Sequence, residues 1–421
     1  MSELKGKKLL VLGATGLICD AVKIAKSMGI YTIVTDYNAD APAKKIADKS
    51  YNISTTDIDE LVKLAHDEKI DGVFTGYSDV NTESAMLLCE RLNLPFYANR
   101  EQLALTANKL AFKQLCREHN VPTVKQFELD SRCLPEHLSK IEYPVMVKPA
   151  DSYASKGCRV CQNEEELLVA VEAALPFSAS KQIIVEQFMD TEVCEDVGIS
   201  YLFVDGTPYL IYNGDRYTNR QQKGFAPLTA AVIAPSDYVD EYMRDVDPYA
   251  KEMFTAIGIK NGRVSIQAFH DKNGYYFYEM GFRLTGGRQY FAVERECGAN
   301  EVVALIQFAL TGKISLDNLE RCTPKYENYY CDLVVICKAG TISKVEGIDE
   351  ILADPRVIDV AQISNVGDVI KAEGTQNQVL CRICIRDESK EKLLTAISEI
   401  GNKVMAYDEN GEPMLLHVWG T

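Results

Sequence analysis

Two periodicities divide the chain into three blocks. Over residues 7–98, short apolar runs such as "KKLLVLG", "YTIVTD" and "IDGVFTG" alternate with helical patterns such as "IDELVKLAHDEK". Strands that alternate with helices predict a parallel sheet covered by helices. We therefore expect an α/β domain over residues 1–99.

The second block, residues 100–320, carries longer strands. A helical pattern at 107–120 is followed by strand-like segments at 181–188, 197–214 and 262–282, which contain Asp-Gly and Asn-Gly turns. Such turns are typical of antiparallel hairpins. The third block, residues 321–421, mixes strand patterns at 330–338 and 378–387 with a helical pattern at 389–401, which predicts an α+β domain.

Composition and charge narrow the classes of protein. The chain has 421 residues, of which 47% are hydrophobic and 25% charged, as in ordinary multidomain globular proteins. Its net charge of −16 argues against nucleic acid or an anionic membrane as the main partner. The N-terminal stretch lacks the apolar core of a signal peptide, and no apolar run is long enough for a membrane span. We expect a cytoplasmic protein.

The spacing of the cysteines and histidines argues against a zinc site and against catalysis by a covalent nucleophile. The pairs Cys158/Cys161 and Cys381/Cys384 have C-x-x-C spacing, but they lie in strand-like text, where the two side chains would face opposite sides of a sheet. This favours reduced structural thiols over a zinc site. The five histidines form no cluster, and no Cys-His or Ser-His arrangement is evident.

The turn "VLGATG" near the N-terminus has two interpretations. Gly13 and Gly16 follow a strand and Asp36 ends the next one, which partly matches a dinucleotide-binding turn. The third glycine of that fingerprint is missing, and tight strand-helix turns need glycine for steric reasons alone. We favour a structural turn or a wall of the substrate site, with an NAD(P)-dependent oxidoreductase as the alternative.

Residues 143–160, "YPVMVKPADSYASKGCRV", place Lys148 at the end of an apolar strand, before a small polar loop that contains Ser152, Ser155 and Gly157. In the Walker motif the lysine follows the glycines, so this segment is a different sequence motif. A lysine ammonium and exposed backbone N–H groups still provide positive potential for phosphate oxygens.

A second group of polar residues lies in "VSIQAFHDKNGYYFYEMGFRLTGG". Gln267 and Glu279 stand on two strand patterns joined by the turn "HDKNG", so a hairpin can bring them opposite each other. Hard oxygen donors of this kind suit Mg²⁺.

Together, these elements resemble the ATP-grasp superfamily, and the overall layout is similar to its carboxylate–amine ligase type, which is related to biotin carboxylase, the carbamoyl-phosphate synthase large subunit and L-amino acid ligases. The resemblance covers residues 100–310 and, with the flanking blocks, nearly the whole chain. It implies ATP and Mg²⁺ (or Mn²⁺) as cofactors, and a flexible B subdomain at about 145–205.

The resemblance also implies where ATP binds. Lys109 and Lys148 would reach the phosphates, and the loop from Ser152 through Ser155 to Gly157 would form a flap over them. The backbone from Glu186 to Phe188 would border adenine. Glu195 would accept from the ribose hydroxyls, with Glu192 as the second choice.

For the chemical step, the resemblance implies a metal held by Gln267 and Glu279 and a catalytic role for Arg283 beside Lys148. Gly281 stands where the family usually has asparagine, which removes a ligand of a second metal ion. The acceptor pocket would be lined by Gly286, Gly287 and Arg288, although Arg288 could equally be a solvated surface residue. A basic group near that pocket, which could also be an exposed loop, comprises Arg216, Arg220 and Lys223.

The resulting prediction is an ATP-dependent ligase. It would phosphorylate a carboxylate to an acylphosphate and join it to an amine, with release of ADP and phosphate. The alternatives are a bicarbonate-activating enzyme like biotin carboxylase, and a nucleotide-binding regulatory protein without turnover. The expected partners are small-molecule carboxylates and amines, and a homodimer is left open.

Overall fold

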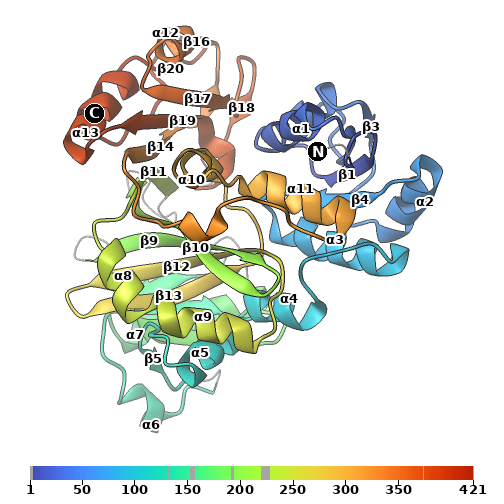
Figure 1. The fold of residues 1–421 in the computed structure, drawn as a ribbon. Coiled ribbons are helices and arrows are strands. Elements are labelled where there is room, and N and C mark those ends of the chain that lie inside the picture. Colours follow the sequence, from blue (N-terminus) through green and yellow to red (C-terminus); the bar gives the residue numbers. More distant parts are fainter. Residues whose placement is uncertain are drawn as a thin grey trace.

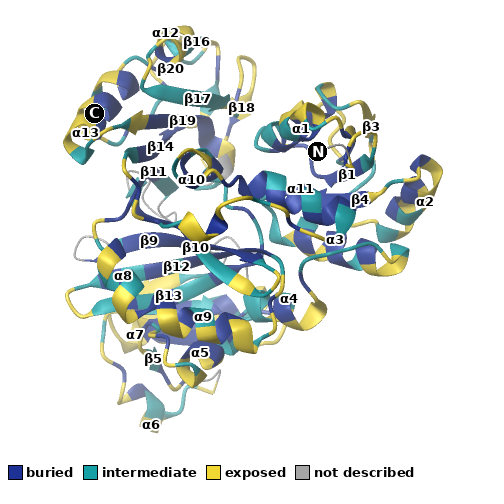
Figure 2. Cartoon of the chain, viewed as in Figure 1, coloured by how far each residue is buried: buried dark blue, intermediate teal, exposed yellow. Residues whose placement is uncertain are grey.

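The computed structural model of the chain describes residues 3–129, 132–151, 157–190, 194–219, 228–372 and 374–420. Figure 1 shows the N-terminal part beside the C-terminal part, with the central part of the chain beneath both. The strands of the central sheet are largely buried, whereas yellow, exposed segments concentrate on outer helices (Figure 2).

The N-terminal part is a parallel sheet with helices around it. Its four strands are β1 (Lys8–Leu12), β2 (Tyr31–Thr35), β3 (Lys49–Tyr51) and β4 (Gly72–Thr75), in the order β3-β2-β1-β4. The connecting helices are α1 (Ile18–Ser27), α2 (Ile58–Glu68) and α3 (Asp79–Leu92). β1 is buried along four of its five residues, as expected for a strand covered on both faces. The predicted α/β architecture is confirmed.

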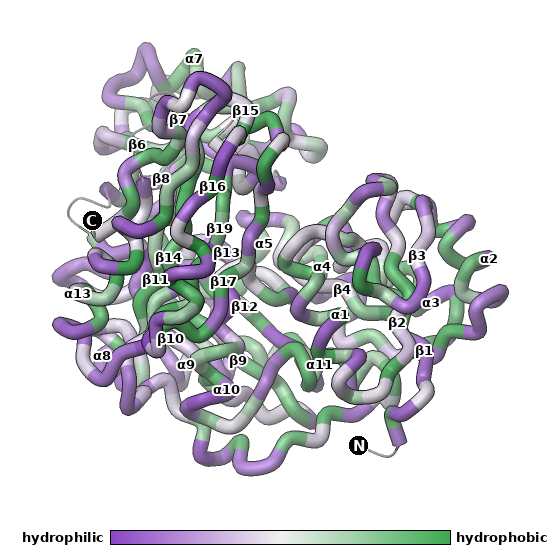
Figure 3. Tube along the Cα trace, turned by 90° about the horizontal axis from the view of Figure 1, so that it is seen from above, coloured by the Kyte–Doolittle hydropathy of each residue, from purple (hydrophilic) through white to green (hydrophobic). Residues whose placement is uncertain are grey.

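A small antiparallel sheet follows helices α4 (Arg100–Ala107) and α5 (Lys109–Glu118). Its strands are β5 (Gln126–Phe127), β6 (Val145–Pro149), β7 (Arg159–Cys161) and β8 (Ile183–Gln187), in the order β5-β8-β6-β7. The short helix α6 (Pro135–Leu138) and α7 (Glu164–Ala174) accompany it. Val145, Val147 and Val185 pack with Leu167 of α7 in one core, so only one face of the sheet is left for other partners. Figure 3 shows β6, β7, β8 and α7 grouped at one end of the molecule.

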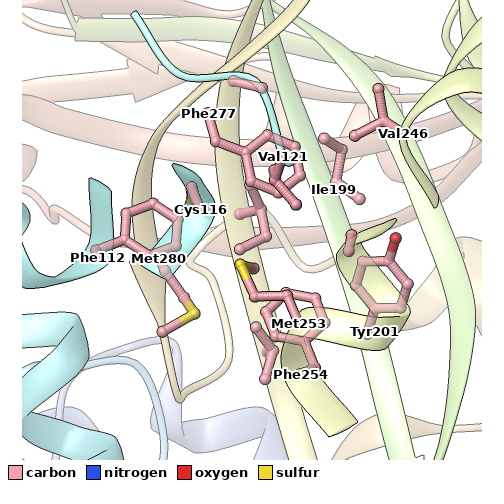
Figure 4. Packing of buried hydrophobic residues seen from close by; sticks show 14 of the residues in the cluster. Phe112, Cys116, Val121, Ile199, Tyr201, Val246, Met253, Phe254, Phe277 and Met280 are labelled. Atoms are coloured by element: carbon pink, nitrogen blue, oxygen red, sulfur yellow. The ribbon is translucent and has the colours of Figure 1, made fainter. Parts of the chain in front are cut away.

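The large sheet has eight strands, in the order β13-β12-β9-β10-β11-β14-β19-β17. Its central-block strands are β9 (Glu195–Val204), β10 (Thr207–Asn219), β11 (Leu228–Ala234), β12 (Gly262–Asp271) and β13 (Gly274–Gly281). One face packs against α5, α8 (Val239–Asp245) and α9 (Asp247–Ala256). Figure 4 shows this core, in which Phe112, Met253 and Phe254 pack beside Ile199, Tyr201 and Phe277 of the sheet. The opposite face is therefore the one available for a site.

The C-terminal block continues the same sheet. Strands β14 (Tyr329–Ile336), β17 (Val357–Gln362) and β19 (Val379–Asp387) join through the β11–β14 pairing, in which Val232 lies opposite Asp332. Helix α13 (Lys390–Gly401) buries Leu393, Ile397 and Ile400 against these strands. The remaining elements are α12 (Ile348–Leu352) and two small pairings, β15 (Gly340–Thr341) with β18 (Val369–Ile370) and β16 (Lys344–Glu346) with β20 (Met405–Tyr407).

Two helices near the end of the second block connect the parts of the molecule. Helix α10 (Tyr290–Cys297) lies near the large sheet, whereas α11 (Glu301–Thr311) packs Val302, Leu305 and Ile306 into the core of the N-terminal sheet. Gly72 of β4 permits this close approach, because a Cβ there would lie 2.2 Å from the Ala309 carbonyl oxygen. None of the helices in the described part of the chain combines the length and apolar character needed to cross a bilayer.

Candidate active site

Lys148 and Glu186 lie on the free face of the small sheet. In the β6–β8 pairing, Met146 stands opposite Glu186 and Lys148 opposite Ile184. The alternate residues of both strands fill the core under α7, so these four side chains point to the other side. The sequence prediction that Lys148 ends a buried strand is confirmed.

Glu186 is shared between two lysines. Its Oε1 contacts Lys148 Nζ, and its Oε2 lies 2.8 Å from Nζ of Lys113, a side chain only 1% exposed. Lys113 Nζ also donates to the Val124 carbonyl at 2.8 Å. Burial lowers the pKa of Lys113, and Glu186 opposes that shift. Burial would also lower the pKa of Lys148, but the Glu186 carboxylate outweighs it, so the Lys148 pKa lies above its usual value. The three groups together carry one net positive charge.

Lys109 begins helix α5 at the same end of the small sheet. Asn108 caps this helix by accepting from the Leu110 and Ala111 N–H groups, and the Lys109 N–H donates to the Ala150 carbonyl at 2.9 Å. This bond ties the helix start to the end of the Lys148 strand. That the two lysine side chains share one phosphate site stays a prediction.

The flap predicted over the phosphates is described only at its last residue. Ser152 and Ser155 lie outside the described residues. Gly157 has φ +76°, and a Cβ there would lie 2.8 Å from Pro149 and 2.9 Å from Phe177. Glycine is therefore required at this position both by its backbone conformation and by close packing.

Gln267 and Glu279 face each other across the β12–β13 hairpin, as the sequence predicted. The Gln267 Oε1 accepts from the Tyr278 hydroxyl at 2.8 Å. Within the described residues, the half-buried carboxylate of Glu279 makes no hydrogen bond or ion pair with another side chain. A partly buried carboxylate with no protein partner, opposite an amide oxygen, fits a divalent cation with a preference for oxygen ligands.

Glu195 does not lie on this face. In the β9–β12 pairing Gln267 stands opposite Gly198 and His270 opposite Glu195, so the strand alternation puts Glu195 on the other side of the sheet. The predicted ribose role therefore does not fit Glu195, and Glu192 lies outside the described residues. The acid on the same face as Gln267 is its neighbour Asp196.

Asp196 and Arg216 form a buried pair that the sequence analysis did not connect. Arg216 Nη1 lies 3.1 Å from both Asp196 Oδ1 and the Tyr278 hydroxyl, and the Tyr278 hydroxyl oxygen lies 3.1 Å from Asp196 Oδ1. Burial raises the pKa of Asp196, although Arg216 opposes the shift. Arg216 thus belongs to the sheet, whereas Arg220 and Lys223 lie outside the described residues.

The free faces of the two sheets meet at these residues. Lys148 Nζ lies 5.6 Å from the centre of the Tyr278 ring, and the charge of Glu279 acts on Lys148. Phe188, at the end of β8, is half-buried and its N–H donates to the Pro144 carbonyl at 3.1 Å. An ammonium group from one sheet and the side-chain oxygens of Gln267 and Glu279 from the other therefore lie in one region of the molecule.

Arg283 follows the hairpin and reaches the N-terminal domain. Its Nε lies 2.6 Å from Oδ1 of Asp79 at the start of α3, and its Nη1 donates to the Leu284 carbonyl at 3.2 Å. The guanidinium is thus held in a fixed orientation beside the strand of Glu279.

Arg288 is fully buried, so the alternative of a solvated surface residue is wrong. Its Nε lies 3.1 Å from Asp20 Oδ2 of the N-terminal domain, and its Nη2 contacts Asp359 of β17. The desolvation penalty of a buried guanidinium requires such partners. Arg288 therefore links the N-terminal part of the chain, through Asp20, to the C-terminal block, through Asp359.

Gly286 and Gly287 lie between residues of the N- and C-terminal parts. A Cβ at Gly286 would lie 3.4 Å from Leu17 and 3.7 Å from Arg382 Nη1, and one at Gly287 would lie 3.7 Å from Asp332 Oδ2. Arg382 Nε lies 3.1 Å from Asp332 Oδ2 across neighbouring strands. The predicted acceptor backbone therefore borders a buried ion pair.

The N-terminal GATG turn is occupied by the chain's own residues. The Ala14 N–H donates to Asp36 Oδ2 at 3.0 Å. A Cβ at Gly16 would lie 3.3 Å from Ile363 and 3.5 Å from the Gln362 carbonyl. Asp36 thus fastens the turn, and Gly16 allows it to pack against the C-terminal block, which supports the structural interpretation.

The sequence reasoning missed several residues of this site, namely Lys113, Asp196, Asp332 and Arg382. Lys113 could have been found, since it follows Lys109 by one helical turn and lies on the same side of the helix. Arg382 stands within the apolar strand text "VLCRICI", where a lone charge signals a buried partner. Its pairing with Asp332 depends on strand order, which local patterns do not reveal.

Comparisons with known proteins identify a family for the central part of the chain. The family "Carbamoyl-phosphate synthase L chain, ATP binding domain" matches residues 108–313. A formate-dependent phosphoribosylglycinamide formyltransferase of Methanocaldococcus jannaschii is 29% identical over 223 residues, which cover 48% of this chain and 57% of that protein. The chain thus spans about half the length of the curated relatives it matches.

Solved structures match over almost the whole chain. An L-amino acid ligase from Bacillus licheniformis has a TM-score of 0.78 at 19% identity, covering 96% of this chain and 100% of that one. The biotin carboxylase domain dimer of Hydrogenobacter thermophilus 2-oxoglutarate carboxylase, in complex with MgADP, ADP and bicarbonate, has a TM-score of 0.79 at 19% identity, covering 97% and 91%.

The family match places the central part of the chain in the ATP-grasp superfamily, and the solved structures show that nearly the whole chain shares one fold with them. Residues 108–313 are its ATP-binding domain, of the type found in the carbamoyl-phosphate synthase L chain.

Proposed function

We propose that the protein is an ATP-dependent carboxylate–amine ligase that releases ADP and phosphate. One observation carries the proposal: Lys148 of the small sheet and the unpartnered carboxylate of Glu279 on the large sheet converge at the place where the two free faces meet. A cation for phosphate oxygens and an oxygen pair for Mg²⁺ are the two requirements of phosphoryl transfer.

The nucleotide would lie between the two sheets. Lys109, Lys148 and the flap from Ser152 through Ser155 to Gly157 would contact the phosphates, and the backbone from Glu186 to Phe188 would border adenine. Asp196 would accept from the ribose, which requires it to share its hydrogen bonds with Arg216. Gln267 and Glu279 would hold Mg²⁺, which supplies charge neutralisation for the transferred phosphoryl group.

The chain's own residues then position the reactants. A substrate carboxylate oxygen forms a bond to the γ-phosphorus while the bond to ADP breaks, which yields an acylphosphate and ADP. Arg283, held by Asp79, stabilises the charge on the transferred group. The amine nitrogen next bonds to the acyl carbon, phosphate leaves, and the amine loses a proton to solvent.

The acceptor would bind at Gly286 and Gly287. The two glycines border the Arg382–Asp332 pair, so a substrate carboxylate could take the place of the Asp332 carboxylate on the guanidinium. The similarity to an L-amino acid ligase supports an amine as the second substrate.

Bicarbonate is the second candidate for the activated carboxylate, because a biotin carboxylase domain solved with bicarbonate shares the fold at a TM-score of 0.79. That domain is a dimer in its structure, so a homodimer of this chain belongs to the same proposal.

The test is phosphate release from ATP-Mg over a matrix of carboxylates and amines, with mass detection of the products. Glu279→Gln serves as the control with strongly reduced turnover. The proposal expects phosphate release that requires one carboxylate and one amine together. Release that requires biotin and bicarbonate would support the second candidate, and ATP binding without release in the whole matrix would indicate a regulatory protein.

A further inference from the structure

Within the described residues, the β12–β13 hairpin presents one pair of side-chain oxygen groups at the proposed metal site. Gln267 and Glu279 stand opposite each other, and the next pair toward the interior on the same face is Ser265 with Gly281. Gly281 has no side chain, and the Ser265 hydroxyl donates to the Gly281 carbonyl at 3.2 Å. Neither residue therefore presents a charged or amide oxygen to a second ion.

Ser265 also occupies the space beside Gly281. A Cβ at Gly281 would lie 3.1 Å from Ser265 Oγ, closer than most real Cβ contacts. A larger side chain at this position, with its own oxygen ligands, would have to displace the serine hydroxyl. The pair Ser265 and Gly281 thus closes this part of the face to additional ligands.

Cations of the protein lie where a second ion would be. The guanidinium carbon of Arg283 would lie 3.9 Å from a Cβ at Gly281, and Asp79 holds it there through the bond to Nε. Arg263, one pair further in on the same face, donates to the Arg283 carbonyl at 2.7 Å. Arg263 is itself paired with Glu301 at 3.2 Å, so a second dication at this place would have to displace guanidinium groups from two ion pairs.

On the outer side of the oxygen pair the sheet presents aromatic rings. Phe269 and Tyr278 stack with their centroids 4.5 Å apart. Asp196 of the neighbouring strand β9 is an acid on this face, but Arg216 and the Tyr278 hydroxyl already engage its Oδ1. Asp332 of β14 lies further along the same row of the sheet, and Arg382 engages it. The oxygen pair is thus bounded on one side by arginines and on the other by rings.

We propose that this site, in the ligase proposed above, holds a single divalent cation and that the guanidinium of Arg283 takes the place of a second one. The single ion is bound by Gln267, Glu279 and the nucleotide phosphates. Arg283 supplies a fixed positive charge instead of an exchangeable ion. The nucleotide site therefore needs only one free metal ion to be complete.

The test counts Mn²⁺ by electron paramagnetic resonance on the full chain saturated with the β,γ-imido analogue of ATP. We expect the wild-type protein to bind one Mn²⁺ per bound nucleotide, with no second saturable ion up to millimolar Mn²⁺. The double variant Gly281→Asp/Ser265→Ala, which adds a carboxylate and removes the hydroxyl in its way, should bind two. Ser265→Ala alone is the matched control and should remain at one.

Two Mn²⁺ per nucleotide in the wild-type protein would overturn the inference. The double variant could also stay folded, bind the analogue and still take up one Mn²⁺. That result would overturn the inference that Ser265 and Gly281 limit the site to one ion. Failure of the wild-type protein to bind the analogue at all would overturn the proposed function itself, so the two failures are distinguishable.

Discussion

Replacing Lys113 by methionine tests the electrostatic arrangement of the nucleotide site. Lys113 and Lys148 contact opposite oxygens of the Glu186 carboxylate, so the wild-type cluster keeps one net positive charge. Methionine preserves the length of the side chain but leaves Lys148 and Glu186 as a neutral pair. Because a neutral pair attracts phosphate less, Lys113→Met should weaken the binding of nucleotides in proportion to their phosphate charge.

The magnitude follows from the geometry. Two ammonium groups on one carboxylate lie within about 8 Å of each other, and unit charges at that distance interact by about 2 kcal/mol at an effective dielectric constant of about 20. A phosphate on Lys148 is slightly further from Lys113, so the expected loss is about 1–2 kcal/mol, or roughly tenfold in the Kd of ATP. The loss should be smaller for ADP and smallest for AMP.

Isothermal titration calorimetry with ATP, ADP and AMP measures this gradient. Lys125→Met is the matched control, since Lys125 is an exposed lysine of the same region, paired with Glu142, and its loss should not change any Kd. Lys113→Gln keeps a donor for the Val124 carbonyl and should show the same gradient as methionine. An equal loss for all three nucleotides, or unchanged ATP affinity in a folded variant, would refute the reasoning.

Three further predictions concern single side chains. Lys148→Ala removes a charge-assisted phosphate contact worth about 1.5–3 kcal/mol and should weaken ATP binding more than tenfold by calorimetry; unchanged affinity would remove Lys148 from the site. Glu279→Gln should lower kcat by about 10²-fold or more with little change in ATP affinity, since the charge acts mainly on the transferred phosphoryl group; Gln267→Ala should do less, and a folded Glu279→Gln protein with wild-type kcat would contradict the assignment. Burial raises the pKa of Asp215 to about 6, so its ionisation destabilises the fold as pH rises from about 4 to about 6, by about 3 kcal/mol at most. Asp215→Asn should therefore raise the melting temperature more at pH 8 than at pH 5, and a lowered melting temperature at pH 8 would count against this account.

The structural features that depend on local sequence patterns were predictable. Alternating strand and helix patterns gave the parallel N-terminal sheet, and the turn "HDKNG" implied the hairpin that sets Gln267 opposite Glu279. Lys148 at the end of β6 was visible because an apolar run stops there. These features depend on periodicity and turn chemistry, which act over a few residues.

Features that depend on strand phase or on distant pairing were not predictable in the same way. Glu195 and Asp196 are neighbours, and only the register of β9 decides which of them faces Gln267. The Arg382–Asp332 pair and the burial of Arg288 arise because the C-terminal strands continue the central sheet through β11 and β14. No pattern near Arg288 reveals that Asp20 and Asp359 meet there.

The most direct test of the central claim is a trapping experiment with hydroxylamine as the amine. The protein is incubated with ATP-Mg and a panel of carboxylates, hydroxamate is measured as its ferric complex, and nucleotides are separated by chromatography. The account predicts hydroxamate and ADP in equal amounts with at least one carboxylate, and formation of both products slowed by about 10²-fold or more with Glu279→Gln. Hydroxamate accompanied by AMP and pyrophosphate would contradict it, because the activated carboxylate would then be an adenylate and the attack would not occur at the γ-phosphate.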